Sequence, residues 1–227
     1  MRLNTLIGMI NLMFIFLQLG NAQKDTTSII WNLDRTERIG DYTTCALLKF
    51  PDVVETPFGK ALHFNGKDQG ILINGNPILN AETFTIEVIF KPDSLRDISN
   101  TEQRIFHIMK QDYEKRRLLI ELRIDKTQQW SLDVFLSSDS SELILYDRKL
   151  SHPVNQWYHI ALVFNNETAI SYVNGKRELT GHFIFLPITD AKISIGVRQT
   201  LISFYKGIVK TIKFTARPLK PSEFINF

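Results

Sequence analysis

The sequence contains a single cysteine, Cys45, among 227 residues. One thiol cannot form an internal disulfide, so the fold must be held together by buried apolar side chains. Small secreted animal domains usually depend on disulfides, and the lack of them favours a bacterial protein if the chain is exported. We expect Cys45 to be a small buried hydrophobic residue rather than a nucleophile.

The sequence also lacks a large excess of charge of one sign. It contains 27 Lys and Arg and 24 Asp and Glu, which gives a formal net charge of +3. The basic residues are spread along the chain rather than gathered in blocks, so the sequence indicates neither a nucleic-acid partner nor an anionic membrane. No Gly-rich phosphate loop, G-x-S-x-G elbow or C-x-x-C pair occurs. The five histidines lack the spacing of a metal site, and His63, His107 and His159 lie inside strand patterns, which favours a structural role.

Long apolar runs are confined to the N-terminus. A positively charged start is followed by a mostly apolar run over residues 6–19 and by Gly-Asn-Ala at 20–22. This pattern predicts a secretory signal peptide over residues 1–22 and a folded domain over 23–227. A membrane anchor is the less favoured alternative, because the run is short and no basic flank follows it. We therefore expect a secreted or periplasmic protein, acting at the cell surface or in the periplasm, with no membrane span after cleavage.

The sequence is rich in the period-two pattern of β-strands. The clearest instance is residues 83–91, where apolar residues alternate with mostly polar ones, and residues 117–124 and 130–136 repeat the pattern. The apolar series of the first segment is Phe84, Ile86, Val88 and Phe90. About a dozen or more such short strands are separated by turn signals, with almost no helical periodicity. The fold class indicated is an all-β antiparallel sandwich in one domain.

The stretch 155–175 predicts a strand, a short break, a returning strand and a turn. Both faces of its first strand are largely apolar, which indicates a central strand with little of either face in water. The dipeptide Asn174-Gly175 suits a two-residue type I′ turn, which requires φ > 0 at both positions. Trp130 and Trp157 lie in apolar series, and we expect them to pack in the core rather than to stack on sugars.

Four segments, taken in order, resemble the LamG-like jelly-roll domains of the concanavalin A-like lectin/glucanase superfamily. They are FGKALHFNG at 58–66, TFTIEVIFKP at 83–92, NQWYHIALVF followed by YVNG within 155–175, and GIVKTIKFTARPLKPSEF at 207–224. The resemblance covers nearly all of the chain after residue 22. It implies a two-sheet antiparallel jelly-roll sandwich, a fold that hosts lectins, glycosidases and structural modules.

The sequence departs from the family pattern at two positions. Ile89 stands where the family often has a tryptophan, which removes one ring able to stack on a sugar. Lys210 stands where the family often has an aspartate, which removes a candidate calcium ligand. Asn65 and Asp68 could still take part in calcium binding, but calcium requires several oxygen ligands and we assign no metal or other cofactor.

The glycosidase relatives carry an E-x-D-x-E set of acids on one strand, because cleavage needs two carboxylates flanking the scissile bond. No such triplet occurs here. The nearest acids, Glu87, Glu121 and Asp133, each stand alone on a separate predicted strand. The sequence therefore predicts a protein that is not an enzyme.

Five residues are the candidate ligand contacts: Glu87, Glu121, Arg123, Asp133 and His159. If the apolar series of their strands face the core, these side chains point outward and could share one sheet face. Such a face is either a polar groove for sugar hydroxyls or a solvated surface with cross-strand ion pairs. We expect an exported, non-catalytic module that binds a glycan. The alternatives are a structural or adhesive surface protein with a protein partner, and a divergent glycoside hydrolase.

Overall fold

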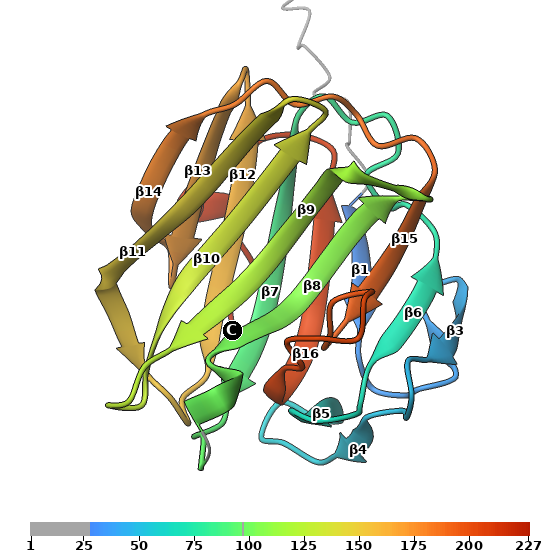
Figure 1. Ribbon diagram of the computed structural model, residues 1–227, viewed down its shortest axis with the longest axis vertical. Helices are drawn as coiled ribbons and strands as arrows, with labels where there is room; N and C mark the ends of the chain where they lie inside the picture. The colour runs from blue at the N-terminus through green and yellow to red at the C-terminus, as the bar shows by residue number, and fades with distance from the viewer. Residues whose placement is uncertain (1–27, 97) are drawn as a thin grey trace, which may run out of the picture.

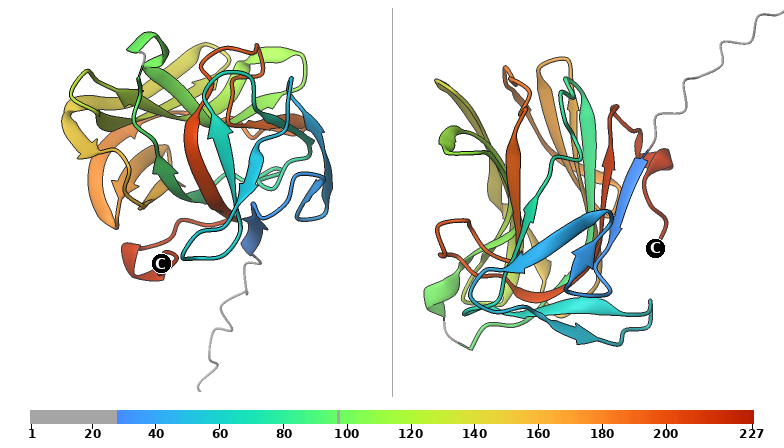
Figure 2. Two further views of the ribbon diagram at one scale, coloured as in Figure 1. Left: turned by 90° about the horizontal axis from the view of Figure 1, so that it is seen from below. Right: turned by 90° about the vertical axis from the view of Figure 1, so that its right-hand side faces the viewer.

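The computed structural model describes residues 28–96 and 98–227, which form two antiparallel sheets of eight strands packed face to face (Figures 1 and 2). The predicted signal peptide over residues 1–22 lies outside the described residues. Within the described residues, no helix has both the length and the apolar character needed to cross a membrane. The fold expected from the sequence, an all-β two-sheet jelly-roll sandwich, is confirmed.

One sheet faces the viewer in Figure 1, and we call it the front sheet. Its strands in spatial order are β11 (Ser141–Pro153), β10 (Gln129–Ser138), β9 (Tyr113–Ile124), β8 (Glu102–Lys110), β15 (Ala191–Ile195), β6 (Ile71–Asn74), β3 (Tyr42–Ala46) and β2 (Arg38–Ile39).

The second sheet, the back sheet, lies behind it. Its strands in spatial order are β14 (Lys176–His182), β13 (Thr168–Val173), β12 (Tyr158–Asn165), β7 (Phe84–Pro92), β16 (Lys206–Thr215), β5 (Ala61–Asn65) and β4 (Asp52–Val54), and β1 (Ser28–Asn32) also pairs with β16. Two short 3₁₀ turns, η1 (Ile98–Asn100) and η2 (Pro221–Glu223), complete the described elements.

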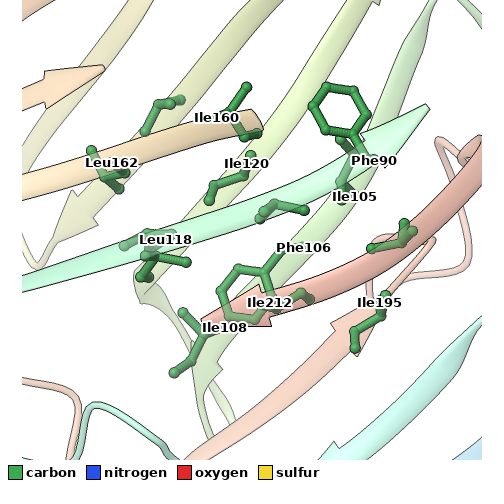
Figure 3. Close-up of a cluster of buried hydrophobic side chains, with 14 of the residues drawn as sticks. Phe90, Ile105, Phe106, Ile108, Leu118, Ile120, Ile160, Leu162, Ile195 and Ile212 are labelled. Carbon is green, nitrogen blue, oxygen red and sulfur yellow. The ribbon is translucent and has the colours of Figure 1, made fainter. Parts of the chain in front are cut away.

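The core fills the space between the sheets with the apolar series that the sequence predicts. The inward side chains of β7 meet those of β8 and β9 across the sandwich (Figure 3). Ten labelled members are Phe90, Ile105, Phe106, Ile108, Leu118, Ile120, Ile160, Leu162, Ile195 and Ile212. Each buried side chain of this size contributes about 1.5–3 kcal/mol by leaving water, so this cluster is the main source of stability. The opposite series of each strand consequently points out of the sandwich.

The predicted hairpin of the stretch 155–175 is present as β12 and β13. Asn174 and Gly175 have φ of 48° and 74°, which confirms the predicted turn. The local sequence pattern fails in two other places. The stretch 34–44 is polar and predicts a loop, yet it contains β2 and much of β3. The strand pattern over residues 142–146 predicts a short strand, yet β11 runs from Ser141 to Pro153. Pairing with β10 across a bulge extends β11, and such pairing leaves no local signal.

Two single-residue predictions are also wrong. Cys45 is exposed, because it alternates with buried Thr44 on β3 and faces away from the core. Trp157 precedes β12 and lies on the outer surface, where its ring centroid is 5.3 Å from that of Phe58. Trp130, by contrast, is fully buried as predicted.

The C-terminal segment crosses the outer face of the back sheet, as the right-hand view of Figure 2 shows. Leu219 and Phe224 form a second apolar cluster there with Ala161 and Val163 of β12. The Leu219 N–H donates to Thr85 Oγ1 at 2.9 Å. The second apolar series of β12 is therefore buried by the chain's own C-terminus.

Candidate functional site

The five predicted ligand contacts do not share one face. Glu87 on β7 and His159 on β12 belong to the back sheet, whereas Glu121, Arg123 and Asp133 belong to the front sheet. Both sets point away from the core, so they lie on opposite sides of the sandwich. The prediction of a common face was wrong because strand periodicity assigns a side chain to a face without assigning its strand to a sheet.

Glu87 and His159 lie beneath the C-terminal segment. Glu87 is fully buried, and its carboxylate accepts from His159 Nε2 at 3.1 Å and from the backbone N–H of Ile225 at 2.6 Å. Lys213 Nζ lies 2.8 Å from the other carboxylate oxygen. Burial alone would raise the pKa of Glu87, but these three donors together hold the pKa below its usual value. This pair anchors the C-terminal segment. Glu87 is shut off from solvent, whereas His159, which is 5% exposed, lines a depression of about 440 Å³ together with Trp157 and Phe227.

On the front sheet, strand register places four polar side chains in one row. Arg104 on β8 is opposite Glu121 on β9, which is opposite Asp133 on β10, which in turn is opposite Tyr146 on β11. Arg104 forms an ion pair with Glu121. Arg123, two residues along β9, donates through Nε to Asp133 Oδ2 at 2.6 Å and also pairs with Glu102. Three of the predicted residues are thus brought together.

Burial has a strong effect on the titrating groups of this face. It raises the pKa of Glu121 to about 8, and the nearby guanidinium of Arg104 offsets this only in part. Burial also lowers the pKa of His107 to about 3, helped by the positive charges of Arg198, Arg117 and Arg104. At neutral pH, therefore, His107 is neutral, and Glu121 is the acid of this face that gains a proton most readily.

A groove at one end of this row contains the exposed aromatic side chain of Tyr146. The Tyr146 side chain is 38% exposed, and the Arg123 guanidinium carbon lies 5.4 Å from its ring centroid. We call this depression of about 270 Å³ the Tyr146 groove; its lining includes Arg123, Asp125, Gln129, Ser131, Tyr146 and Arg148. The groove therefore combines one aromatic surface with hydrogen-bonding groups from three strands.

A second depression of about 140 Å³ lies beside the first, and Arg123 lines both. We call it the arginine pocket, because it is lined by Arg104, Arg117, Arg123 and Arg198, together with Glu121 and Asp133. Sequence reasoning found Arg123, Glu121 and Asp133 from the outward face of their strands. It missed Arg117, which lies on the same outward series of β9, and it could not place Tyr146 or Arg198, which strand register and a loop bring to the site.

The two residues considered for calcium lie at a different turn. Asn65 Nδ2 donates to Asp68 Oδ1 at 2.8 Å, and Asp68 pairs with Lys49. Across residues 28–96 and 98–227, no three side chains of His, Cys, Asp or Glu are grouped in a way that could hold a metal ion. The carboxylate of Asp68 is thus occupied by groups of the protein itself.

Two antiparallel sheets with an outward polar face over a closed apolar core define a lectin-like jelly-roll sandwich. The chain belongs to the concanavalin A-like lectin/glucanases superfamily, whose family model matches residues 65–224. None of the curated proteins matches this sequence.

Solved structures with the same fold include several sugar-binding domains. Domain 4 of AbnA, a GH43 extracellular arabinanase from Geobacillus stearothermophilus solved with arabinotriose, is 18% identical with a TM-score of 0.64, covering 86% of this chain and 94% of that chain. The CBM40 domain of the Ruminococcus gnavus IT-sialidase, bound to α2,3 sialyllactose, is 14% identical with a TM-score of 0.58. The match covers 72% of this chain and 92% of that chain. The binding domain of botulinum neurotoxin DC is 17% identical with a TM-score of 0.60, and the match covers 87% of this chain and 50% of that chain. At these identities the likeness shows the fold alone.

Proposed function

We propose that this protein is an exported, non-catalytic module that binds a glycan in the Tyr146 groove on the outer face of the front sheet. The observation that carries the proposal is the exposed Tyr146 side chain surrounded by Arg123, Gln129 and Arg148. The sugar-bound domains among the solved neighbours support the ligand class.

The chemistry of the groove suits a sugar. A sugar ring has an apolar face of C–H groups, which packs on an aromatic ring, and a rim of hydroxyls, which needs donors and acceptors around it. The guanidinium groups of Arg123 and Arg148 donate, the Asp125 carboxylate accepts, and the Gln129 amide does both. Because the groove is a shallow surface feature, we expect modest affinity with selectivity for a few sugar units.

The direct test is binding of the purified protein to a glycan array, followed by calorimetry on the best ligand. We expect Tyr146→Ala to weaken binding at least tenfold, equivalent to about 1.4 kcal/mol. Tyr113→Ala is the matched control, because Tyr113 is 39% exposed but lies outside the groove. Equal binding by the wild type and Tyr146→Ala, or an absence of glycan binding with capture of a protein partner instead, would contradict the proposal.

Export is tested separately by N-terminal sequencing of the protein recovered outside the cytoplasm. We expect the mature chain to begin at Gln23, as the pattern over residues 1–22 predicts. A secreted chain that still begins at Met1, or a chain retained in the cytoplasm, would contradict this part of the proposal.

A second function is favoured by one observation, the position of Glu121 directly opposite Asp133. Two neighbouring carboxyl groups with different protonation states are the arrangement that glycosidases use. Here, however, the two residues are only 3% and 1% exposed, and each is engaged by an arginine. A substrate bond could not lie between them without displacing Arg104 and Arg123, so binding is the better supported function. Release of reducing sugar that disappears in Glu121→Gln would establish hydrolysis instead.

A further inference from the structure

The arginine pocket has an excess of positive charge. Four guanidinium groups reach it, three from β8 and β9 and the fourth, Arg198, from the loop between β15 and β16. Two carboxyl groups share the pocket, those of Glu121 and Asp133. Even with both carboxyl groups ionised, the lining carries four guanidinium groups against two carboxylates, and Glu102 pairs with Arg123 and Arg104 from outside the lining.

Two of the arginines are neutralised weakly or not at all from within the described part of the protein. Arg198 forms no ion pair among the described residues, and its Nε is buried without a hydrogen-bond partner. Arg117 Nε is likewise buried without a partner, and the ion pair of Arg117 with Glu114 is weak, because it is 3.4 Å long and the Glu114 side chain is 58% exposed. Arg104 and Arg123, in contrast, are committed to Glu121 and Asp133. The donors that remain for a ligand inside the arginine pocket therefore belong mainly to Arg117 and Arg198.

The pocket is also partly preorganised. The Arg117 guanidinium carbon lies 5.0 Å from the ring centroid of Phe135, a cation–π contact that restricts the side chain. His107, which is 1% exposed, lies within the field of Arg104, Arg117 and Arg198, and its Nε2 has no hydrogen-bond partner among the described residues. Buried donors without partners are costly, and an anion that accepts their hydrogen bonds offsets that cost.

The size of the pocket selects a small group. Pockets that enclose a whole ligand usually exceed about 300 Å³, whereas this one has about 140 Å³. A carboxylate or a sulfate ester matches both the volume and the planar fork of a guanidinium group. Arg123 also lines the Tyr146 groove, so a charged substituent in the pocket would be attached to a ring in the groove.

We propose that the glycan is acidic, and that its carboxylate or sulfate group occupies the arginine pocket between Arg117 and Arg198 while its ring lies in the Tyr146 groove. This inference rests on the proposed function and adds the class of ligand. The positive charge contributed by the pocket is local, since the chain as a whole carries a formal net charge of only +3.

The test compares an acidic polysaccharide with its own neutral form and with a sulfated polysaccharide. Calorimetry is performed on the wild-type protein with polygalacturonate, with the same polymer after reduction of its carboxyl groups, and with dextran sulfate, which carries sulfate esters and no carboxylate. We expect at least a tenfold preference for one or both charged polymers over the neutral one, and a loss of that preference at high salt. The two charged polymers distinguish a carboxylate from a sulfate ligand.

Variants test whether the arginine pocket binds the acidic group of the polymer. We expect Arg198→Gln to lower affinity for the acidic polymer at least tenfold, because Arg198 lies in a loop and its removal leaves no buried carboxylate unpaired. Arg177→Gln is the matched control, since it also removes one positive charge, from an exposed site on β14, and should leave affinity within about twofold. In the wild type, binding of the acidic polymer should shift the NMR signals of the His107 ring, a readout that does not depend on any variant.

The outcomes separate this inference from the proposed function. Equal affinity for the acidic and the carboxyl-reduced polymer, with loss of both in Tyr146→Ala, would overturn the inference and leave glycan binding intact. Equal binding of poly-glutamate that does not depend on Tyr146 would also overturn it, in favour of an acidic peptide. Binding of no glycan, charged or neutral, would overturn the proposed function and this inference with it.

Discussion

The backbone N–H of Ile225 donates a hydrogen bond of 2.6 Å to the carboxylate of Glu87, a residue 138 positions earlier in the chain. The same carboxylate holds Lys213 and His159 on neighbouring strands of the back sheet. Phe224, next to Ile225, packs on the His159 ring with 5.4 Å between the ring centroids. A single buried acid thus attaches the C-terminal segment to the outer face of the back sheet.

We predict that Glu87→Ala destabilises the protein by about 3–5 kcal/mol, because it leaves Lys213 and His159 buried without their partner. Denaturant unfolding measures the change, and hydrogen exchange at Ile225 should accelerate more than exchange in the core strands. Glu142→Ala removes an exposed carboxylate and should stay within about 0.5 kcal/mol of the wild type. Slow exchange at Ile225 in Glu87→Ala would contradict the anchoring role.

His107 should make the protein sensitive to acid. Its pKa is about 3 in the folded state against 6.5 when exposed, so the unfolded state binds a proton more readily. The stability that neutral His107 provides is therefore present above pH 6.5 and is lost as the pH falls from 6.5 towards 3. One pKa unit corresponds to about 1.4 kcal/mol, which sets an upper limit of about 5 kcal/mol.

The measurement is the unfolding free energy across this range for the wild type and His107→Gln. The variant should lose less stability on acidification, because glutamine has no proton to gain. The facing groups Arg104, Arg117 and Arg198 keep their charge throughout the range. If the unfolding free energies of the two proteins fell in parallel with pH, His107 would not contribute to the acid sensitivity.

Glu121 should affect the pH dependence of stability in the opposite direction, so that its contribution falls as the pH rises. Its pKa is about 8 in the folded state against 4.5 when exposed, so its favourable contribution is full below pH 4.5 and is lost as the pH rises to 8. The charged groups that face it are Arg104, Glu102, Arg123 and Asp133, from β8, β9 and β10. Ionisation of Glu121 also adds a negative charge to the arginine pocket, so affinity for an acidic glycan should fall as the pH rises through 8.

Glu121→Gln is the informative variant, because it keeps the shape of the side chain without the titration. We expect the affinity for the acidic glycan to become independent of pH between about 7 and 9 in this variant. The unfolding free energy should likewise vary less between pH 4.5 and 8 than in the wild type. A wild-type affinity that does not change across pH 8 would contradict the prediction.

Substitutions at two glycines, Gly175 and Gly196, distinguish the cost of backbone strain from the cost of a steric clash. Gly175 and Gly196 both have positive φ, 74° and 82°, but a methyl group at Gly175 would meet no atom within 4 Å. At Gly196 it would overlap the ring of Phe64. We expect Gly175→Ala to cost about 1–2 kcal/mol from strain alone and Gly196→Ala distinctly more, as measured by denaturant unfolding.

Because Gly196 begins the loop that carries Arg198, its substitution should also weaken binding of an acidic glycan, while Gly175→Ala should not. Equal unfolding costs for the two variants would contradict this account.

Much of the sandwich was predictable from local patterns. The alternation of Phe84 and Ile86 with Thr85 and Glu87 reports which side chains point inward, and this depends only on neighbours two residues apart. The turn at Asn174 depends on its own backbone preference and was also predictable. The same patterns identified Glu121, Arg123 and Asp133 as outward residues, and all three line the arginine pocket.

The composition of the site was decided only by tertiary structure. Tyr146 lies opposite Asp133 because of the register between β10 and β11, and Arg198 reaches the pocket from a loop that follows β15. Register and loop placement depend on contacts between residues far apart in the chain, and these leave no periodic signal. For the same reason the sequence showed that Glu87 points outward, but only the fold placed it on the opposite side of the sandwich, beneath the chain's own C-terminus.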